Sequence, residues 1–479
     1  MKCVHTGSGR RSTPKDFKPT LDLAYRHALR FLEGAREGAA DASFDQAEAR
    51  RRLGAVLPEC STPDEIVIEE FAVAAEGGIV PTMGGRFFGF VIGGVHPAGV
   101  AADWLSAAWD DSPGTPLASP FGCAVDTIAG EWALELLDLP REASVGIVTG
   151  ATVGNFVCIC AARHALLKRM GWDVEAQGLF GAPEISVVIS DALHPTVKQG
   201  LRMAGLGAER VISVATDENG SMREDSLEHA LRDASDPVLV CTTAGQINTG
   251  HSDPFVKVAS LLKSRNAWMH VDGAFGLWAQ VSSRTKHLTK GVALADSWSV
   301  DAHKLLNSPY DGAFAIVRDK NAHAGAMSIQ ASYLPQPPGA RDPSHFVPEL
   351  SRRGRGHAIY ATMKALGRQG IREAIEGLHD NTLRMARFLT REAGISCLNE
   401  VVFNQAIFRM TDRTGDAGAS DRLTDAVALE VRKGGEAWFQ TADWHGQRIM
   451  RCSVSDHSTT AADVDRAASA VISAYRKLA

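Results

Sequence analysis

The sequence predicts an α/β protein whose core is a mixed, mostly parallel sheet of seven strands with helices on both faces. Its 479 residues suggest two or three domains, and a composition of 45% hydrophobic and 22% charged residues is ordinary for a globular protein. Short β-rich runs alternate with helical runs, which favours parallel strands covered by helices. The predicted strands are 145–149, 184–190, 209–215, 237–243, 267–272, 295–300 and 312–317, and the helices between them are 154–170, 195–204, 224–234 and 253–265.

Helical and mixed segments flank this central region. From about residue 19 apolar residues recur at helical spacing as far as Leu32, and these early helices could pack on the chain itself or on a partner. The segment 326–350 is rich in proline and has no period, so we expect a functional or mobile loop. The other predicted helices are 43–57, 122–138, 355–367, 375–392 and 420–433, and the other predicted strands are 402–410 and 436–454, with a hairpin turn at 444–447.

Charge and cysteine content exclude several classes of protein. A net charge of −6 gives no basic footprint for nucleic acid or an anionic membrane, and no apolar run is long enough to span a bilayer. The first twenty residues lack the apolar core of a secretory signal. The eight cysteines have no CxxC spacing and form no metal-ligand set, so we expect reduced thiols in a cytoplasmic protein without a metal site.

Four polar elements follow the ends of predicted strands. Lys304 ends the sequence SWSVDAHK, and Asp272 ends a strand in HVDGAF. His194 follows another strand in SDALH, and the small residues of 149–155 join a strand to a helix. The carboxyl ends of parallel strands meet at one edge of a sheet, which is the usual place for a ligand.

The four elements have ordinary interpretations when each is taken alone. The lysine could be a surface residue, the aspartate a helix cap or half of an ion pair, and the histidine a structural one. Together they offer an amine, a carboxylate, a flat imidazole and a helix N-terminus that can bind an anion. That combination is what a phosphorylated aromatic aldehyde cofactor requires.

These motifs resemble those of the pyridoxal-phosphate-dependent group II amino-acid decarboxylases, relatives of aromatic amino-acid, histidine and glutamate decarboxylases. HVDGAF is similar to their HVDAA(F/Y), DAHKLL to their N/D-x-HKW/L, and SDALHPTV to their SDxAHxS. The stretch 118–120 and the run LSRRGRG at 350–356 also fit. The resemblance extends over roughly 20–475 with the motifs in consistent order.

The resemblance implies a fold-type I transferase architecture and a homodimer with a shared active site. It divides the chain into an N-terminal helical segment at 1–85 that packs on the partner subunit, a large cofactor-binding domain at 86–365 and a small α+β domain at 366–479. The implied cofactor is pyridoxal 5'-phosphate, and the implied substrate is a small-molecule amino acid.

The resemblance also assigns roles to single residues. Lys304 would form the internal aldimine, Asp272 would keep the pyridine nitrogen protonated, and His194 would stack on the ring. Further cofactor contacts are Ala151, Thr152, Ser299 and His303 at the phosphate, Ala274 on the opposite face of the ring, and Gln246 and Asn248 nearby. Substrate contacts are Arg451, which would bind the carboxylate, Phe90 and Val91, which would line the pocket, and His345.

The implied reaction is decarboxylation of an L-amino acid through an external aldimine and a quinonoid, giving the amine and carbon dioxide. One departure concerns the loop tyrosine that protonates the quinonoid carbon in aromatic amino-acid decarboxylases. Pro343 falls near that position, and His345 could be the acid instead. Relatives without the tyrosine can form an aldehyde, so an aldehyde synthase or an aminotransferase is the alternative outcome.

Two other classes of protein compete with this interpretation. The run TGATVG at 149–154 and the pair Tyr360 and Lys364 are similar to motifs of short-chain dehydrogenases, but the third glycine is missing and the gap between the motifs is too long for that fold. A non-catalytic scaffold would have no use for Lys304, Asp272 and His194 together. We therefore favour the decarboxylase.

Overall fold

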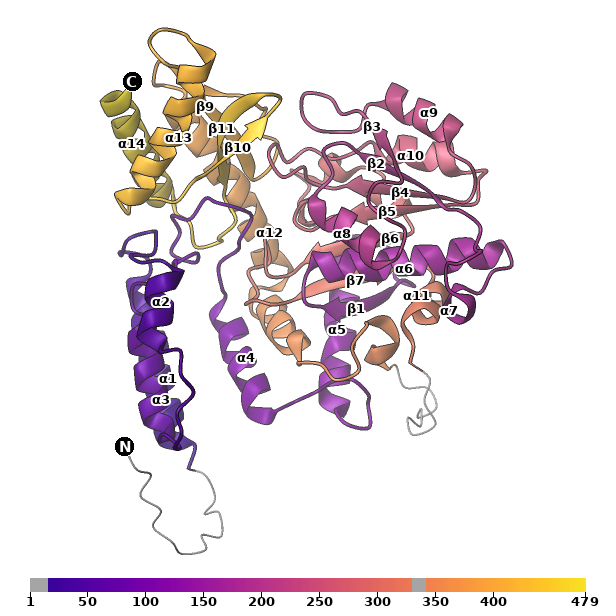
Figure 1. The fold of residues 1–479 in the computed structure, drawn as a ribbon, viewed down its shortest axis with the longest axis horizontal. Coiled ribbons are helices and arrows are strands. Elements are labelled where there is room, and N and C mark those ends of the chain that lie inside the picture. The colour runs from indigo at the N-terminus through magenta and orange to yellow at the C-terminus, as the bar shows by residue number, and fades with distance from the viewer. Residues whose placement is uncertain (1–15, 330–341) are drawn as a thin grey trace, which may run out of the picture.

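A seven-stranded sheet forms the centre of the computed structural model, which describes residues 16–329 and 342–479 (Figure 1). The spatial order is β1-β7-β6-β5-β4-β2-β3, and only β7 is antiparallel to its neighbours. This confirms the predicted mixed, mostly parallel sheet. The strands are β1 (Ser144–Val148), β2 (Ser186–Ser190), β3 (Val211–Val214), β4 (Val238–Thr243), β5 (Ala267–Asp272), β6 (Ser297–Asp301) and β7 (Ala313–Val317), each within a few residues of its predicted bounds.

Alternate residues of each strand enter two different apolar cores. In β2, Val187 and Ile189 belong to one core and Val188 to the other. In β4, Leu239 and Cys241 alternate with Val240 in the same way. Side chains of a strand point to opposite faces with a period of two, so apolar residues at every position require cover on both faces.

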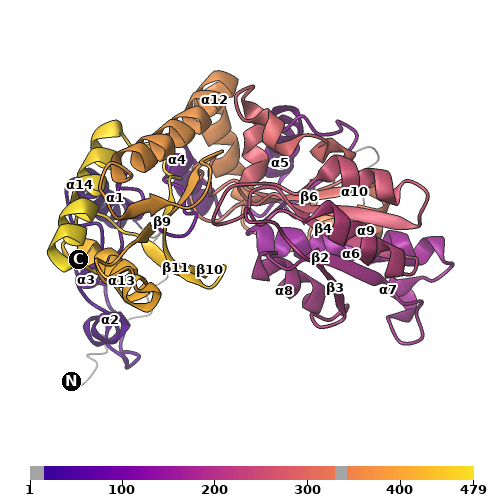
Figure 2. The same ribbon diagram turned by 90° about the horizontal axis from the view of Figure 1, so that it is seen from above.

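Helices provide this cover (Figure 2). One face carries α6 (Ala151–Arg169) and α8 (Pro195–Met203), with α7 (Val174–Gln177) and α11 (Lys320–Met327) packed on α6. The other face carries α5 (Pro120–Leu136), α9 (Glu224–Asp233), α10 (Phe255–Leu262) and the 3₁₀ turns η1 (Gly276–Val281), η2 (Lys286–Thr289) and η3 (Val292–Leu294).

A second sheet lies in the C-terminal region, with the antiparallel order β10-β11-β9-β8. Its strands are β8 (Ile395–Cys397), β9 (Gln405–Met410), β10 (Gln440–Trp444) and β11 (Gln447–Ser453), and its helices are α13 (Ala417–Lys433) and α14 (Ala461–Leu478). The predicted hairpin is confirmed: His445 and Gly446 form its tip, both with positive φ, as a tight two-residue turn requires. The predicted helices 355–367 and 375–392 are one helix, α12 (Arg355–Leu389), with a kink at Gly367 where φ is 61°.

The N-terminal region contains α1 (Lys18–Gly34), α2 (Gln46–Leu53), α3 (Asp64–Ala75) and α4 (Pro97–Trp109). Many of their apolar side chains face solvent in the single chain. Leu21 of α1 is 54% exposed and Phe71 of α3 is 62% exposed. Within the segment 326–350, residues 330–341 lie outside the described residues, and η4 (Pro343–Phe346) follows them.

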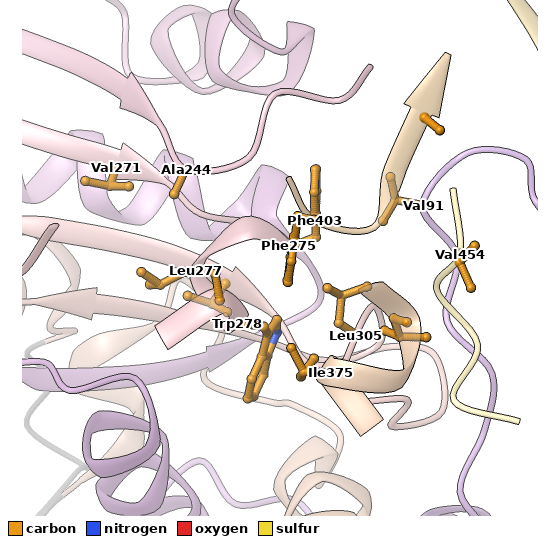
Figure 3. Close-up of a cluster of buried hydrophobic side chains, with 14 of the residues drawn as sticks. Val91, Ala244, Val271, Phe275, Leu277, Trp278, Leu305, Ile375, Phe403 and Val454 are labelled. Atoms are coloured by element: carbon orange, nitrogen blue, oxygen red, sulfur yellow. The ribbon is translucent and has the colours of Figure 1, made fainter. Parts of the chain in front are cut away.

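The two sheets are joined by an extended segment near residue 88 and by an apolar cluster. The Phe88 amide donates to the carbonyl of Trp438 at 2.8 Å, and the Ser453 amide donates to the carbonyl of Phe88 at 2.9 Å. Figure 3 shows part of the cluster, in which Phe275, just before η1, lies beside Phe403 of the C-terminal region. The cluster fixes how the C-terminal sheet sits beside the carboxyl ends of the strands.

The structure bears on two predictions, the state of the cysteines and the lack of a membrane-spanning segment. Cys60 is disulfide-bonded, which differs from the predicted set of reduced thiols. Among residues 16–329 and 342–479 the free thiols are those of Cys123, Cys158, Cys160, Cys241, Cys397 and Cys452. Among the described residues no helix is both long and apolar enough to cross a membrane.

Candidate functional site

A cavity of about 330 Å³ opens at the carboxyl ends of the central strands. Loops that follow β1, β2, β4, β5 and β6 all contribute to its wall, as expected where parallel strands end together. The lining residues are Phe90, Val91, Gly150, Ala151, Thr152, Ala192, His194, Thr196, Thr243, Gly245, Gln246, Ile247, Asp272, Ala274, Phe275, Asp301, His303 and Lys304.

The amine of Lys304 reaches this cavity from the loop after β6. Its Nζ lies 2.9 Å from Oδ2 of Asp301, the residue that ends the strand. The carbonyl of Lys304 meets the segment that contains Gly93, where any Cβ would come within 2.0 Å of that oxygen. A glycine at position 93 therefore allows this segment to lie directly against the lysine loop.

Asp272 is buried at the end of β5 and is held by two donors. Its Oδ1 accepts from the amide of Ala274 at 3.1 Å, and its Oδ2 lies 3.4 Å from Nδ2 of Asn155 on α6. A buried carboxylate requires such partners, and it can also hold a proton on a ring nitrogen at its remaining lone pairs.

A chain of buried polar groups orients Asn155. Its Oδ1 lies 2.9 Å from Nε2 of His270 and also accepts from the hydroxyl of Ser299. Nδ1 of His270 lies 3.0 Å from Oγ of Ser297. Burial lowers the pKa of His270 to about 3, so its ring is neutral and can donate to Asn155 through one N–H. The amide nitrogen of Asn155 is consequently turned toward Asp272.

His194 lies at the N-terminus of α8 with its ring at the cavity. Its Nδ1 accepts from the amide of Thr196 at 3.3 Å and lies 2.8 Å from the Thr196 hydroxyl. Burial lowers the pKa of His194, with smaller and opposing effects from Asp272 and Lys304. The site therefore contains a neutral, fixed imidazole.

The N-terminus of α6 provides backbone donors on the same side of the cavity. Gly150, Ala151 and Thr152 line the wall there. His303 lies beside them: its Nδ1 accepts from the amide of Gly312 at 3.2 Å, which leaves Nε2 as the donor. Burial lowers the pKa of His303, so this ring is also neutral. Amides and a ring N–H at a helix N-terminus suit an anionic group such as a phosphate.

Three predicted cofactor contacts have distinct placements. Gln246 lines the cavity, and its Oε1 accepts from the amides of Asn248 and Thr249 at 2.5 and 3.2 Å. Asn248 is buried in the same loop and does not line the cavity. Ser299 also lies outside the wall, because its hydroxyl is turned to Asn155.

The predicted substrate contacts divide into two pairs. Phe90 and Val91 line the cavity. His345 lies in η4, outside the wall, with its ring 6.4 Å from that of Phe346. Arg451 of β11 stands behind the wall: its Nη2 donates to the carbonyl of Ile247 at 2.7 Å. Arg451 as a whole residue is 5% exposed, and no carboxylate of the described chain forms a salt bridge with its guanidinium; burial lowers the pKa of Arg451 to about 10.

The ring of Phe90 is held in position by Trp438 of the C-terminal region. Phe90 has a positive φ of 52°, which is uncommon for a non-glycine residue, and its ring stacks on Trp438 with centroids 5.4 Å apart. Phe87 stacks on the same indole at 4.8 Å. The indole also packs on Gly89, where a Cβ would come within 1.9 Å of it.

Several residues of the site were not predicted as functional. The hydroxyl of Thr243 is buried at the cavity and has no hydrogen-bond partner in the described chain, so it is available to a ligand. Asp301 pairs with Lys304, and Asn155 and His270 orient Asp272. Thr243 ends a predicted strand, Asp301 directly follows one and His270 lies within one, which is the signal that could have identified them. Asn155 lies in the run of small residues at 149–155.

The fold and the cavity define a fold-type I pyridoxal-phosphate enzyme. Residues 48–411 match the family described as the pyridoxal-dependent decarboxylase conserved domain, which is more than half of the chain, and the chain belongs to this family. It is a pyridoxal-phosphate-dependent carboxy-lyase.

Named relatives are similar over most of the chain. An aromatic-L-amino-acid decarboxylase of Bacillus atrophaeus is 23% identical over 385 residues, covering 78% of each protein. A 4-hydroxyphenylacetaldehyde synthase of Rhodiola rosea is 23% identical over 417 residues, 84% of this chain and 83% of the relative. The crystal structure of Oryza sativa TDC with PLP and tryptamine has a TM-score of 0.90 at 21% identity and covers 98% of this chain and 99% of that one.

The residues present fit the cofactor of this family. Pyridoxal phosphate carries an aldehyde, a basic ring nitrogen, a hydroxyl group on the ring and a phosphate. The cavity wall offers an amine at Lys304, a carboxylate at Asp272, an unpartnered hydroxyl at Thr243 and the amides at the start of α6.

Proposed function

We propose that this enzyme decarboxylates an L-amino acid, aromatic or other, to the corresponding amine and carbon dioxide. The observation that carries the proposal is the single cavity in which the Lys304 amine, the Asp272 carboxylate, the His194 ring and the N-terminus of α6 meet. Pyridoxal phosphate, when bound, supplies an aldehyde that captures amino groups and a ring that accepts the electrons of the broken bond.

Three side chains have the central roles in this proposal. Lys304 offers the amine that holds the aldehyde between turnovers. Asp272 keeps a proton on the pyridine nitrogen, and its two donors from Ala274 and Asn155 hold the carboxylate in place for this. His194 would stack on one face of the bound ring as a neutral imidazole, and Ala274, which also lines the cavity, would pack on the other face.

The phosphate group would lie at the start of α6. Ala151 and Thr152 contribute the helix N-terminus, and His303 contributes its Nε2–H. The Ser299 hydroxyl donates to Oδ1 of Asn155, so it could bind the phosphate only after breaking that bond. A role in orienting Asn155 is therefore better supported for Ser299. Gln246 and Asn248 complete the loop beside the cofactor.

Arg451 is our candidate for binding the substrate carboxylate. Its support is a buried guanidinium with no acidic partner among the described residues and an Nε without a hydrogen-bond acceptor. An unpaired buried charge is costly, and an anionic substrate would neutralise it. Phe90 and Val91 would contact the substrate side chain.

A product assay tests the function directly. Purified protein is supplied with pyridoxal phosphate and each amino acid in turn, and carbon dioxide, amine, aldehyde, ammonia and peroxide are measured. Decarboxylation predicts carbon dioxide and amine in equal amounts. No carbon dioxide from any amino acid would refute the proposal.

The second candidate is oxidative formation of an aldehyde, or else transamination. It is favoured by Pro343, which stands near the position of the family's loop tyrosine and is buried in η4. A relative over most of the chain is named as an aldehyde synthase. His345 is our proposed replacement acid, and because it lies outside the cavity of its own chain it would have to act at a cavity shared between subunits. Aldehyde, carbon dioxide, ammonia and peroxide, formed with consumption of dioxygen, would identify the oxidative reaction. A keto acid formed without carbon dioxide, when a second keto acid is supplied as amino-group acceptor, would identify transamination.

We also propose a homodimer with a shared active site. The support is the set of exposed apolar side chains on α1, α3, α4 and α5, among them Tyr25, Phe71, Trp109 and Phe121. Sedimentation equilibrium should give twice the chain mass, and a monomer at micromolar concentration would contradict the proposal. The cytoplasm is the compartment that we propose; the buried free thiols of Cys158, Cys160 and Cys241 support it, and the disulfide-bonded Cys60 stands against it.

A further inference from the structure

Asp301 occupies an unusual position for a negative charge. This residue ends β6, is 2% exposed and lies in the wall of the cavity. Its Oδ1 accepts from the amide of Ala151, the first residue of α6, at 2.6 Å. Its Oδ2 lies 2.9 Å from Nζ of Lys304. One carboxylate thus engages both the helix N-terminus and the amine.

These two partners are the groups that pyridoxal phosphate also uses. A helix N-terminus is favourable for an anion because its first amides have no intrahelical acceptor. Nε2 of His303, the other donor there, lies 3.6 Å from Oδ1 of Asp301. A phosphate in this part of the cavity would meet a carboxylate that competes for the same donors and repels its charge.

We propose that Asp301 is a cofactor-selecting residue that weakens the hold of this site on the phosphate while it positions the Lys304 amine for the aldehyde. The inference rests on the proposed location of the phosphate at α6. It assigns opposite effects to one side chain: the carboxylate opposes phosphate binding and supports aldehyde capture. The family motif resembled at this position has asparagine or aspartate, so the neutral isostere suits the loop.

The experiment separates the two effects with a matched pair of ligands. Pyridoxal 5'-phosphate and pyridoxal differ only in the phosphate, and both aldehydes give an absorbance band when bound to a lysine. Dissociation constants for both are measured on the full-length wild type, Asp301→Asn and Asp301→Ser. The ratio of the constant for pyridoxal to that for pyridoxal phosphate reports the contribution of the phosphate.

In both Asp301 variants this ratio should rise by about tenfold or more, because a negative charge beside the phosphate is removed. The affinity for pyridoxal should stay the same or fall, because Lys304 loses its partner. Inorganic phosphate, used alone as a second probe, should raise the melting temperature of Asp301→Asn more than that of the wild type.

Asp272→Asn is the matched control, since it removes a carboxylate of the same cavity that does not contact the start of α6. It should change the affinity for both aldehydes alike and leave the ratio unchanged. A ratio that is unchanged or lower in the Asp301 variants would overturn the inference. If the wild type bound neither aldehyde, the proposed function itself would fail, which is a different result.

Discussion

The two sides of the cavity are built in different ways. The proposed cofactor side consists largely of residues that end or directly follow strands of one sheet, and buried hydrogen bonds fix them, as in the series Asp272, Asn155 and His270. The proposed substrate side consists of Phe90 and the region around Arg451, which belong to an extended segment and to the second sheet. Phe90 has a strained backbone and is 46% exposed.

The difference shows which part of the chemistry is fixed within the central sheet. The polar residues of the cofactor side gain their positions from strand ends that need no other domain. On the substrate side, each position depends on packing between distant parts of the chain, as in the stack of Phe90 on Trp438. We expect changes on the cofactor side to affect turnover and changes on the substrate side to affect substrate affinity.

Replacing Asp272 with asparagine should have the largest effect. Without the carboxylate the ring nitrogen loses its proton partner, and kcat should fall by about a thousandfold or more while the protein still folds. Steady-state kinetics and circular dichroism measure the two properties. Asp443→Asn, on the exposed surface of β10, is the control. Wild-type turnover in Asp272→Asn would refute the role of this residue.

Arg451→Gln tests the substrate side. Loss of a buried positive charge that binds the substrate carboxylate should raise KM by about a hundredfold. Arg448→Gln is the matched control on the same strand, because Arg448 pairs with Asp425 at the surface. Equal KM values for the two variants would show that Arg451 only anchors the loop through Ile247.

His270→Gln tests how burial of an imidazole on this side of the cavity changes the free energy of unfolding with pH. Above pH 6.5 the ring is neutral in both the folded and the unfolded chain. As the pH falls below 6.5 the unfolded chain binds a proton that the folded chain refuses until about pH 3, so the free energy of unfolding decreases. Between pH 7.5 and 5 this residue accounts for a loss of about 2 kcal/mol.

Urea denaturation at the two pH values measures this loss. The loss of unfolding free energy between pH 7.5 and 5 should be smaller by that amount in His270→Gln than in the wild type. In His229→Gln, whose side chain is exposed on α9, this loss should equal that of the wild type. Identical pH dependence in the wild type and His270→Gln would mean that the buried ring titrates normally.

Trp438→Leu should have the smallest effect of the four. Removal of the indole releases Phe90, and KM should rise by about tenfold with little change in kcat, because the cofactor side is untouched. Trp172→Leu, far from the cavity beside α7, is the control. A fall in kcat without a change in KM would show that the two sides are not separable.

Much of the central sheet and its strand-end residues could be predicted from the sequence. Strands such as β4 and β5 are short, apolar and bounded by turn residues, and Lys304, Asp272 and His194 follow strands directly. The helices α3, α4 and α14 were not predicted. For α14 a local signal existed, since Thr460 and Asp463 form a capping box.

The remaining features depend on contacts between distant residues. Nothing near Ser299 indicates that its hydroxyl turns to Asn155, because that choice depends on how α6 packs against β6. Likewise, the place of Arg451 behind Ile247 follows from the docking of the second sheet against the loop after β4. Side-chain direction at such sites is set by tertiary packing, which local patterns do not encode.

Chemical trapping of the cofactor shows which lysine of the chain binds the aldehyde. The protein is incubated with pyridoxal phosphate, reduced with borohydride, digested with trypsin and analysed by mass spectrometry. Modification of Lys304 blocks cleavage there, so we expect one phosphopyridoxyl-bearing peptide that spans residues 291–318. A label on another lysine, or efficient cleavage after Lys304 with no label on the protein, would contradict it.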